Sequence, residues 1–183
     1  MKRTSRPQKQ ITILACDPSI TAWGWAVVDQ YGEVIIAGCI KTQPEQKKRR
    51  IRKGDDDVRR ISELVKTLLT VIRENDISYI VNELPHGSQN ASAAKMIGVV
   101  TGVMQTLADT LDIGIEWYSE GDAKKCLLGK TSATKREVIN AISKQYDVPW
   151  TGTKYIDEAI ADALAIHLVA YEQSATLKMM RRK

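Results

Sequence analysis

Isolated acidic residues in apolar segments constrain this chain more than any other feature. Asp17 follows the run ITILAC, Glu83 follows ISYIVN, and Asp162 lies within EAIADALAIHLVA. A carboxylate at the end of an apolar strand is costly to bury unless a cation or hydrogen-bond donors compensate its charge. Any one of these acids alone is consistent with a surface residue or a helix cap. Because three of them occur far apart in the sequence, they together predict one shared metal site.

The spacing of apolar residues predicts an α/β fold. Strands are expected at residues 11–16, 23–29, 34–40, 77–82 and 114–118, and helices at residues 57–75, 91–109, 119–128, 133–145 and 157–173. Helices that cross between strands bring acids at strand ends to one edge of a sheet. The 183 residues fit a single domain over residues 11–173, with basic tails at residues 1–10 and 174–183.

Composition narrows the class of protein. The net charge of +5 and the pI near 9.1 favour a polyanionic partner. The cysteines Cys16, Cys39 and Cys126 form no CxxC pair, which argues against a disulfide scaffold or a zinc ribbon. The N-terminal residues lack the apolar stretch of a signal peptide, and no apolar run is long enough to span a bilayer. We therefore expect a cytoplasmic protein.

Several segments resemble the RuvC-type Holliday junction resolvases, which have the ribonuclease H-like fold. They are DPSITAWGWAVV, AGCIKT, NELPHGSQNASAAKMIGVVTG, WYSEGDAKKCLLGKTSATKREV and DALAIHL, and the resemblance runs from about Ile11 to Leu168. It implies a mixed five-stranded sheet flanked by helices. It also implies a homodimer that cuts opposing strands of a four-way DNA junction with Mg²⁺ or Mn²⁺. The basic N-terminal extension and the departures described below suggest a divergent member, such as one encoded by a phage.

The resemblance assigns Asp17, Glu83 and Asp162 as ligands of two ions, which suits the oxygen preference of Mg²⁺. Family members carry an acid or a histidine three residues before the last aspartate, where this chain has Ala159. Glu158 lies four residues before Asp162 and so shares its helical face, whereas Asp157 is turned away unless it caps the helix start. Both remain candidates for the fourth ligand, with Glu158 slightly favoured. Either is also explained as an acid stabilised by the helix dipole.

Basic and polar residues that match the family predict contacts with DNA. Lys124 and Lys135 match lysines near the scissile phosphate, where they would neutralise charge in the transition state. His86 occupies a position where relatives stack an aromatic ring on a base, although an exposed turn residue is an equal explanation. Further contacts are expected from residues in the matched segments, namely Gln89, Asn90 and Lys130.

An unmatched basic run contains Lys47, Lys48, Arg49 and Arg50. It is expected either to bind the phosphates of a DNA arm or to form a solvated loop that leads into a helix. The remaining aromatic residues and His167 have a simpler interpretation. We expect His167 to be structural, and we expect packing roles for Trp23, Trp25, Trp117 and Trp150.

Small residues recur along the segment 91–109, at Ala91, Ala94, Gly98, Gly102 and Ala108. They favour close approach of another backbone, either the partner in a dimer or the protein's own sheet. Three other functions remain open. One is a ribonuclease H-like nuclease for flaps, forks or hybrids, and another is a non-catalytic junction-binding protein that lost activity through Ala159. A kinase-like member of the fold is disfavoured because no GxxxxGK[ST] phosphate loop is present.

Overall fold

The computed structural model describes residues 10–45 and 51–181. In chain order the elements are β1 (Thr12–Asp17), β2 (Ala22–Asp29), β3 (Val34–Lys41), α1 (Lys53–Glu74), β4 (Tyr79–Glu83), α2 (Ala91–Thr110), β5 (Gly114–Tyr118), α3 (Glu120–Leu128), α4 (Lys135–Gln145), α5 (Lys154–Gln173) and α6 (Ala175–Met180). The basic run Lys47–Arg50 lies outside the described residues, and so does the N-terminal tail up to residue 9.

The strands form a mixed sheet of five strands in the order β3-β2-β1-β4-β5. The β1–β2 and β2–β3 pairs are antiparallel, as expected for a meander with short turns. The β1–β4 and β4–β5 pairs are parallel, and α1 and α2 make the two crossovers. The prediction of a mixed five-stranded sheet flanked by helices is therefore confirmed.

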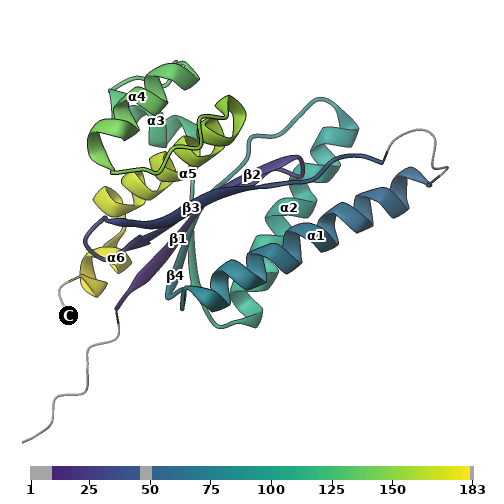
Figure 1. The fold of residues 1–183 in the computed structure, drawn as a ribbon, viewed down its shortest axis with the longest axis horizontal. Coiled ribbons are helices and arrows are strands. Elements are labelled where there is room, and N and C mark those ends of the chain that lie inside the picture. The colour runs from purple at the N-terminus through teal and green to yellow at the C-terminus, as the bar shows by residue number, and fades with distance from the viewer. Residues whose placement is uncertain (1–9, 46–50, 182–183) are drawn as a thin grey trace, which may run out of the picture.

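The strand residues alternate between two hydrophobic layers, because successive side chains point to opposite faces of a sheet. Ile13 and Ala15 of β1 pack in one layer with α3, α4 and α5. Leu14 and Cys16 pack in the other layer with α1 and α2. Figure 1 shows these two groups of helices on opposite sides of the sheet. The side-chain alternation thus determines which helices each strand residue meets.

Helix α5 packs unusually close to the sheet at Gly24 of β2. A Cβ atom built on Gly24 would lie 2.0 Å from the carbonyl oxygen of Ala159, so only glycine fits there. Gly24 is the register partner of Asp17 in β1. The close approach therefore holds the first half of α5 against the strand end that carries Asp17.

Several boundaries differ from the sequence prediction. Helix α1 begins at Lys53, four residues before the predicted start, because acids in its first turn pair with neighbouring arginines, Asp55 with Arg52 and Asp56 with Arg59. Helix α5 begins at Lys154, before the predicted start near residue 157. Residues that the sequence analysis assigned to a basic tail form α6. Its cap is Ser174, and its Leu177 is buried against the α5 side of the sheet.

The histidine and tryptophans predicted to be structural are in the packed interior. His167 is fully buried, its Nδ1 lies 2.8 Å from the hydroxyl of Tyr146, and burial lowers its pKa to about 3. Trp23 is buried, and Trp25, Trp117 and Trp150 pack against the two hydrophobic layers. In the described part of the chain, no helix combines the length and apolar character needed to cross a membrane.

Candidate active site

The carboxylates predicted to form a site meet at the carboxyl ends of the parallel strands. Asp17 ends β1 and Glu83 ends the neighbouring strand β4. Asp17 is two residues from Ala15, and Glu83 is two residues from Val81, so both continue the rows that face α5. Because the strands are parallel neighbours, their last residues lie at the same edge of the sheet. This is the face and edge where α5 crosses.

Helix α5 supplies the third acid from the opposite side. The side chain of Asp162 is almost completely buried, at 8% exposure, within a helix that packs on β1, β2 and β4. Its Oδ2 accepts a hydrogen bond from the Nζ of Lys135, the first residue of α4. The capping box of Thr134 and Glu137 holds that first turn in place. The structure therefore brings together Asp17, Glu83, Asp162 and Lys135 from four different elements.

The electrostatics of the cluster show an excess of negative charge. Burial raises the pKa of Asp17 to about 7, with a further rise from Asp162 that Lys135 opposes. Burial also raises the pKa of Glu83 to about 8, and the charges of Asp17, Glu120 and Asp162 add to that rise. For Asp162, burial raises the pKa, and the Lys135 ammonium partly offsets the effect. A single lysine therefore does not neutralise the cluster.

Both matched lysines lie at the cluster. Burial alone would lower the pKa of Lys135. The negative charges of Asp162, Asp17 and Glu120 outweigh the effect of burial, so the pKa of Lys135 is raised. Lys124 on α3 forms an ion pair with Glu120, with 2.6 Å between Nζ and Oε1, and its side chain is only 15% exposed. The hydrogen bond from Lys124 lowers the pKa of Glu120, so this carboxylate is ionised at neutral pH.

Glu120 is the acid of this cluster that the sequence analysis missed. It is the first residue of α3, two residues after the end of β5, and it contributes to the pKa of Asp17, Glu83 and Asp162. An acid just after a strand parallel to β4 was the available signal. Its position directly after Ser119 instead resembles an ordinary acid in the first turn of a helix.

The two candidates for the fourth ligand are not brought into the cluster. The carboxylate of Asp157 accepts hydrogen bonds from the Thr151 amide at 2.9 Å, the Thr151 hydroxyl at 2.8 Å and the Gly152 amide at 3.0 Å. It therefore closes the loop before α5. Glu158 lies 4.0 Å from the ammonium of Lys154. It is not among the charges that shift the pKa of Asp17, Glu83 or Asp162.

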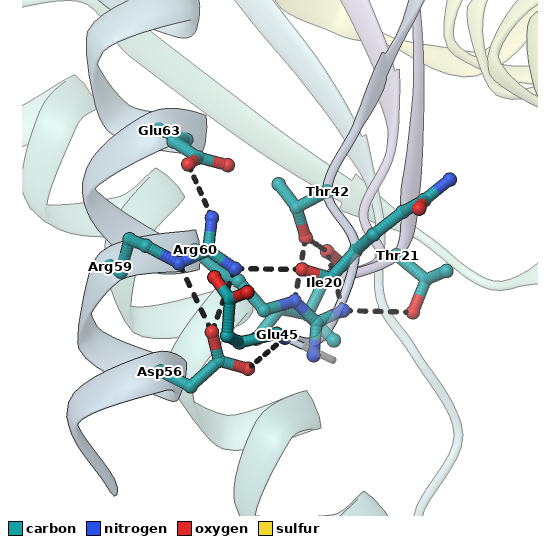
Figure 2. A network of polar contacts seen from close by, with 9 residues as sticks. Ile20, Thr21, Thr42, Glu45, Asp56, Arg59, Arg60 and Glu63 are labelled. Atoms are coloured by element: carbon teal, nitrogen blue, oxygen red, sulfur yellow. Dashed lines mark hydrogen bonds and ion pairs between the residues drawn. The ribbon is translucent and has the colours of Figure 1, made fainter. Parts of the chain in front are cut away.

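The loop that follows Asp17 is held by a buried arginine on α1. Arg60 donates from Nε to the Thr42 hydroxyl at 2.8 Å, and from Nη2 to the Ile20 carbonyl at 3.3 Å and the Thr21 hydroxyl at 3.2 Å. Figure 2 shows this guanidinium between the loop and the end of β3. Next to it, Arg59 binds Asp56, whose Oδ2 accepts from the Glu45 amide at 3.1 Å. The network fixes the backbone immediately after the metal-ligand candidate Asp17.

The other predicted DNA contacts lie on the surface around this edge. His86 is exposed in the loop between β4 and α2. Gln89 is exposed, whereas the Asn90 side chain caps α2 by accepting from the Ala93 amide at 3.1 Å. Lys130 pairs with Glu137 on the surface. These side chains are accessible to a ligand, but the polar groups of Asn90 and Lys130 already have partners.

The donor set suits a hard divalent cation in its chemistry. It offers carboxylate oxygens with uncompensated charge, which is what Mg²⁺ and Mn²⁺ require. Among the described residues, no three His, Cys, Asp or Glu side chains lie close enough together to hold one ion as they stand. The cation that the cluster holds in this conformation is the ammonium of Lys135. Metal binding therefore requires the side chains of the cluster to rearrange.

A mixed five-stranded sheet, with acids at the ends of its parallel strands and an acid on the last long helix, is the arrangement of the ribonuclease H-like class. The sequence profile of the family "Crossover junction endodeoxyribonuclease RuvC" matches residues 13–170. The chain therefore belongs to the RuvC family, as the sequence analysis predicted. Enzymes of this family are metal-dependent nucleases.

Individual relatives are distant but cover most of the chain. The crossover junction endodeoxyribonuclease RuvC of Chlorobium phaeobacteroides is 25% identical over 161 residues, which is 86% of this chain and 80% of that protein. The RuvC protein of Ehrlichia canis is 23% identical and covers 84% of this chain and 94% of its own length.

Solved structures share the fold at lower identity. Thermus thermophilus RuvC in complex with a Holliday junction substrate superposes with a TM-score of 0.70 at 20% identity, over 91% of this chain and 97% of that chain. The yeast mitochondrial Holliday junction resolvase superposes with a TM-score of 0.60 at 12% identity, over 97% of this chain and 85% of that chain.

Proposed function

We propose that this protein resolves four-way DNA junctions as a homodimer, by hydrolysing one phosphodiester bond in each of two opposing strands. The observation that carries the proposal is the meeting of Asp17, Glu83 and Asp162 with Lys135 at the carboxyl edge of the sheet. Family membership supports the reaction class, and the basic pI of about 9.1 is consistent with a polyanionic substrate. Because DNA junctions form in the cytoplasm of a bacterial cell, we expect the protein to act there.

The carboxylates of Asp17, Glu83 and Asp162 would hold Mg²⁺, with two ions in each active site. When bound, such a pair supplies an activated water and stabilises the departing 3′ oxygen. The chain needs no serine or histidine nucleophile for this reaction. His167, which could otherwise act as a base, is buried and neutral.

The two lysines have separate roles in the proposed reaction. Lys135 favours the ionised form of Asp162 and partly offsets the effect of burial, and its ammonium would face the phosphate oxygens that gain negative charge. Lys124 stands one helical turn into α3 beside the same cluster. Its side chain, which is mostly buried, would lie near the bond that is cleaved.

Helix α2 is the proposed dimer contact. Ala91, Ala94, Gly98 and Gly102 are exposed, and nothing lies within 4 Å of a Cβ built on either glycine. Ala108, the fifth small residue, is buried against the sheet instead. A second copy packed on this face would place two equivalent sites for opposing strands.

The decisive experiment is a cleavage assay with purified protein and Mg²⁺. The substrates are labelled four-way junctions, forks, flaps, duplex and RNA–DNA hybrids. We expect paired nicks in opposing strands of the junction, no cleavage by Asp17→Asn, and undiminished junction binding by that variant in EDTA. Preferred cleavage of flaps or hybrids would indicate the alternative nuclease. Binding without cleavage by the wild-type protein would indicate a junction-binding protein.

A further inference from the structure

We propose that Glu120 is the fourth carboxylate of this metal site, in place of the acid that the chain lacks at Ala159. The inference rests on the proposed function, because it names an additional ligand of the same site. A carboxylate at the start of α3 would thus replace the metal ligand that family members carry on the helix equivalent to α5.

The fold places Glu120 at the correct edge of the sheet. Strand β5 is the parallel neighbour of β4, and Tyr118 is the register partner of Glu83. The Leu84 amide donates to the Tyr118 carbonyl at 2.8 Å, so the chain segments leaving the two strands remain side by side. Glu120 follows two residues later. Because β1, β4 and β5 run in the same direction, the exits of all three strands supply an acid to one site.

The local structure of α3 restrains Glu120. Ser119 caps the helix by accepting from the Asp122 amide at 3.0 Å, which fixes the backbone on either side of Glu120. Lys124 holds the carboxylate one turn along the helix, and the Glu120 side chain keeps 34% exposure. The cap holds the backbone of Glu120 independently of Lys124, and the carboxylate is ionised and partly accessible, as metal ligation requires.

The negative charge of Glu120 acts on the other three acids of the cluster. It adds to the rise in the pKa of Asp17, Glu83 and Asp162, which agrees with the position that the β4–β5 pairing gives Glu120 at this edge of the sheet. Its own neighbours are the site's lysines, Lys124 and Lys135. No other carboxylate beyond the predicted three has this relation to all of them in the described residues.

The two candidate acids on α5 make polar contacts away from the cluster. Asp157 accepts three hydrogen bonds from Thr151 and Gly152, so recruiting it would open the loop before the helix. Glu158 lies 4.0 Å from the Nζ of Lys154, and it does not appear among the charges that raise the pKa of Asp17, Glu83 or Asp162. The backbone of α5 at Ala159 packs directly on Gly24, so a rotation of the helix that carried these acids inward would disturb this contact.

The experiment measures metal binding to the full chain in the absence of DNA. Titration calorimetry with Mn²⁺ and the rise in melting temperature with Mg²⁺ give affinity without relying on cleavage. The variants are Glu120→Gln, Glu158→Gln and Lys124→Met, with Asp17→Asn as the reference for loss of a ligand. Glu172→Gln is the matched control, since it removes an exposed glutamate at the far end of α5. Circular dichroism confirms that each variant is folded.

We expect Glu120→Gln to weaken Mn²⁺ binding by at least about tenfold, while Glu158→Gln binds like the Glu172→Gln control. Lys124→Met separates a ligand from a structural residue, because it removes the ion pair and leaves the carboxylate. It should bind Mn²⁺ as tightly as the wild type, or more tightly. Wild-type affinity in Glu120→Gln, the larger loss in Glu158→Gln, or an equal loss in Lys124→Met would each overturn the proposal. Normal metal binding by Asp17→Asn would instead refute the metal site of the proposed function.

Discussion

Replacing Asp17 by asparagine should stabilise the metal-free protein while removing its activity. Burial and neighbouring carboxylates raise the pKa of Asp17 from its ordinary value of 3.8 to about 7. The folded state therefore binds a proton more tightly than the unfolded state, and stability falls as pH rises between these two values. Below 3.8 the group is neutral in both states and contributes nothing. Above about pH 7 the full penalty of burying its charge is present.

The size of this effect follows from the shift. One pKa unit corresponds to about 1.4 kcal/mol, so a rise of about three units sets an upper limit of about 4 kcal/mol at pH 8. Asparagine recovers less than this, because its amide is also polar and must also be desolvated. We expect Asp17→Asn to raise the free energy of unfolding by about 1 to 3 kcal/mol at pH 8, and by under about 1 kcal/mol at pH 4.5.

Urea denaturation of both proteins in EDTA, at pH 4.5 and pH 8, measures the difference. Saturating Mg²⁺ should reverse the order at pH 8, because the wild type gains binding energy that the variant lacks. Asp29→Asn is a control for removing an aspartate that is buried in a turn and hydrogen-bonded to the amides of Tyr31 and Glu33; it should be destabilising. A destabilising effect of Asp17→Asn of equal size at both pH values would refute the charge-repulsion argument.

Three further outcomes are expected. Gly24→Ala should lower the free energy of unfolding in urea by about 3 kcal/mol or more, because its Cβ would lie 2.0 Å from the Ala159 carbonyl oxygen. The control Gly54→Ala, at the exposed start of α1, should be neutral or stabilising. Lowering the pH from 8 to 6 should increase the Mg²⁺ needed for half-maximal cleavage, because protons compete for Asp17 and Glu83; an unchanged requirement would count against their role as ligands. Replacing Lys47, Lys48, Arg49 and Arg50 by alanine should weaken junction binding and reduce its salt dependence, and an unchanged salt slope would assign this run to a solvated loop.

Much of the fold and three members of the site were predictable from the sequence, because the relevant signals are local. The apolar runs before Asp17 and Glu83 mark two strand ends, and the period of two places both acids on one face. The helical spacing around Asp162 marks an apolar helix that must cover that face. Lys124 and Lys135 were assigned by resemblance to a family, and the structure places both at the cluster.

The tertiary structure decided the rest, since it depends on contacts between segments far apart in the chain. Helix geometry alone favoured Glu158, but its side chain pairs with Lys154, and the hydrogen bonds of Asp157 go to the loop before the helix. Glu120 resembles an ordinary acid in a first helical turn until the β4–β5 pairing places the end of β5, two residues before it, beside Glu83. Spacing along the sequence determines the face on which a side chain lies. The packing of α3 and α5 on the sheet determines which of those side chains meet. Residues far apart in the sequence become close, and are buried together, only when these helices cover the sheet.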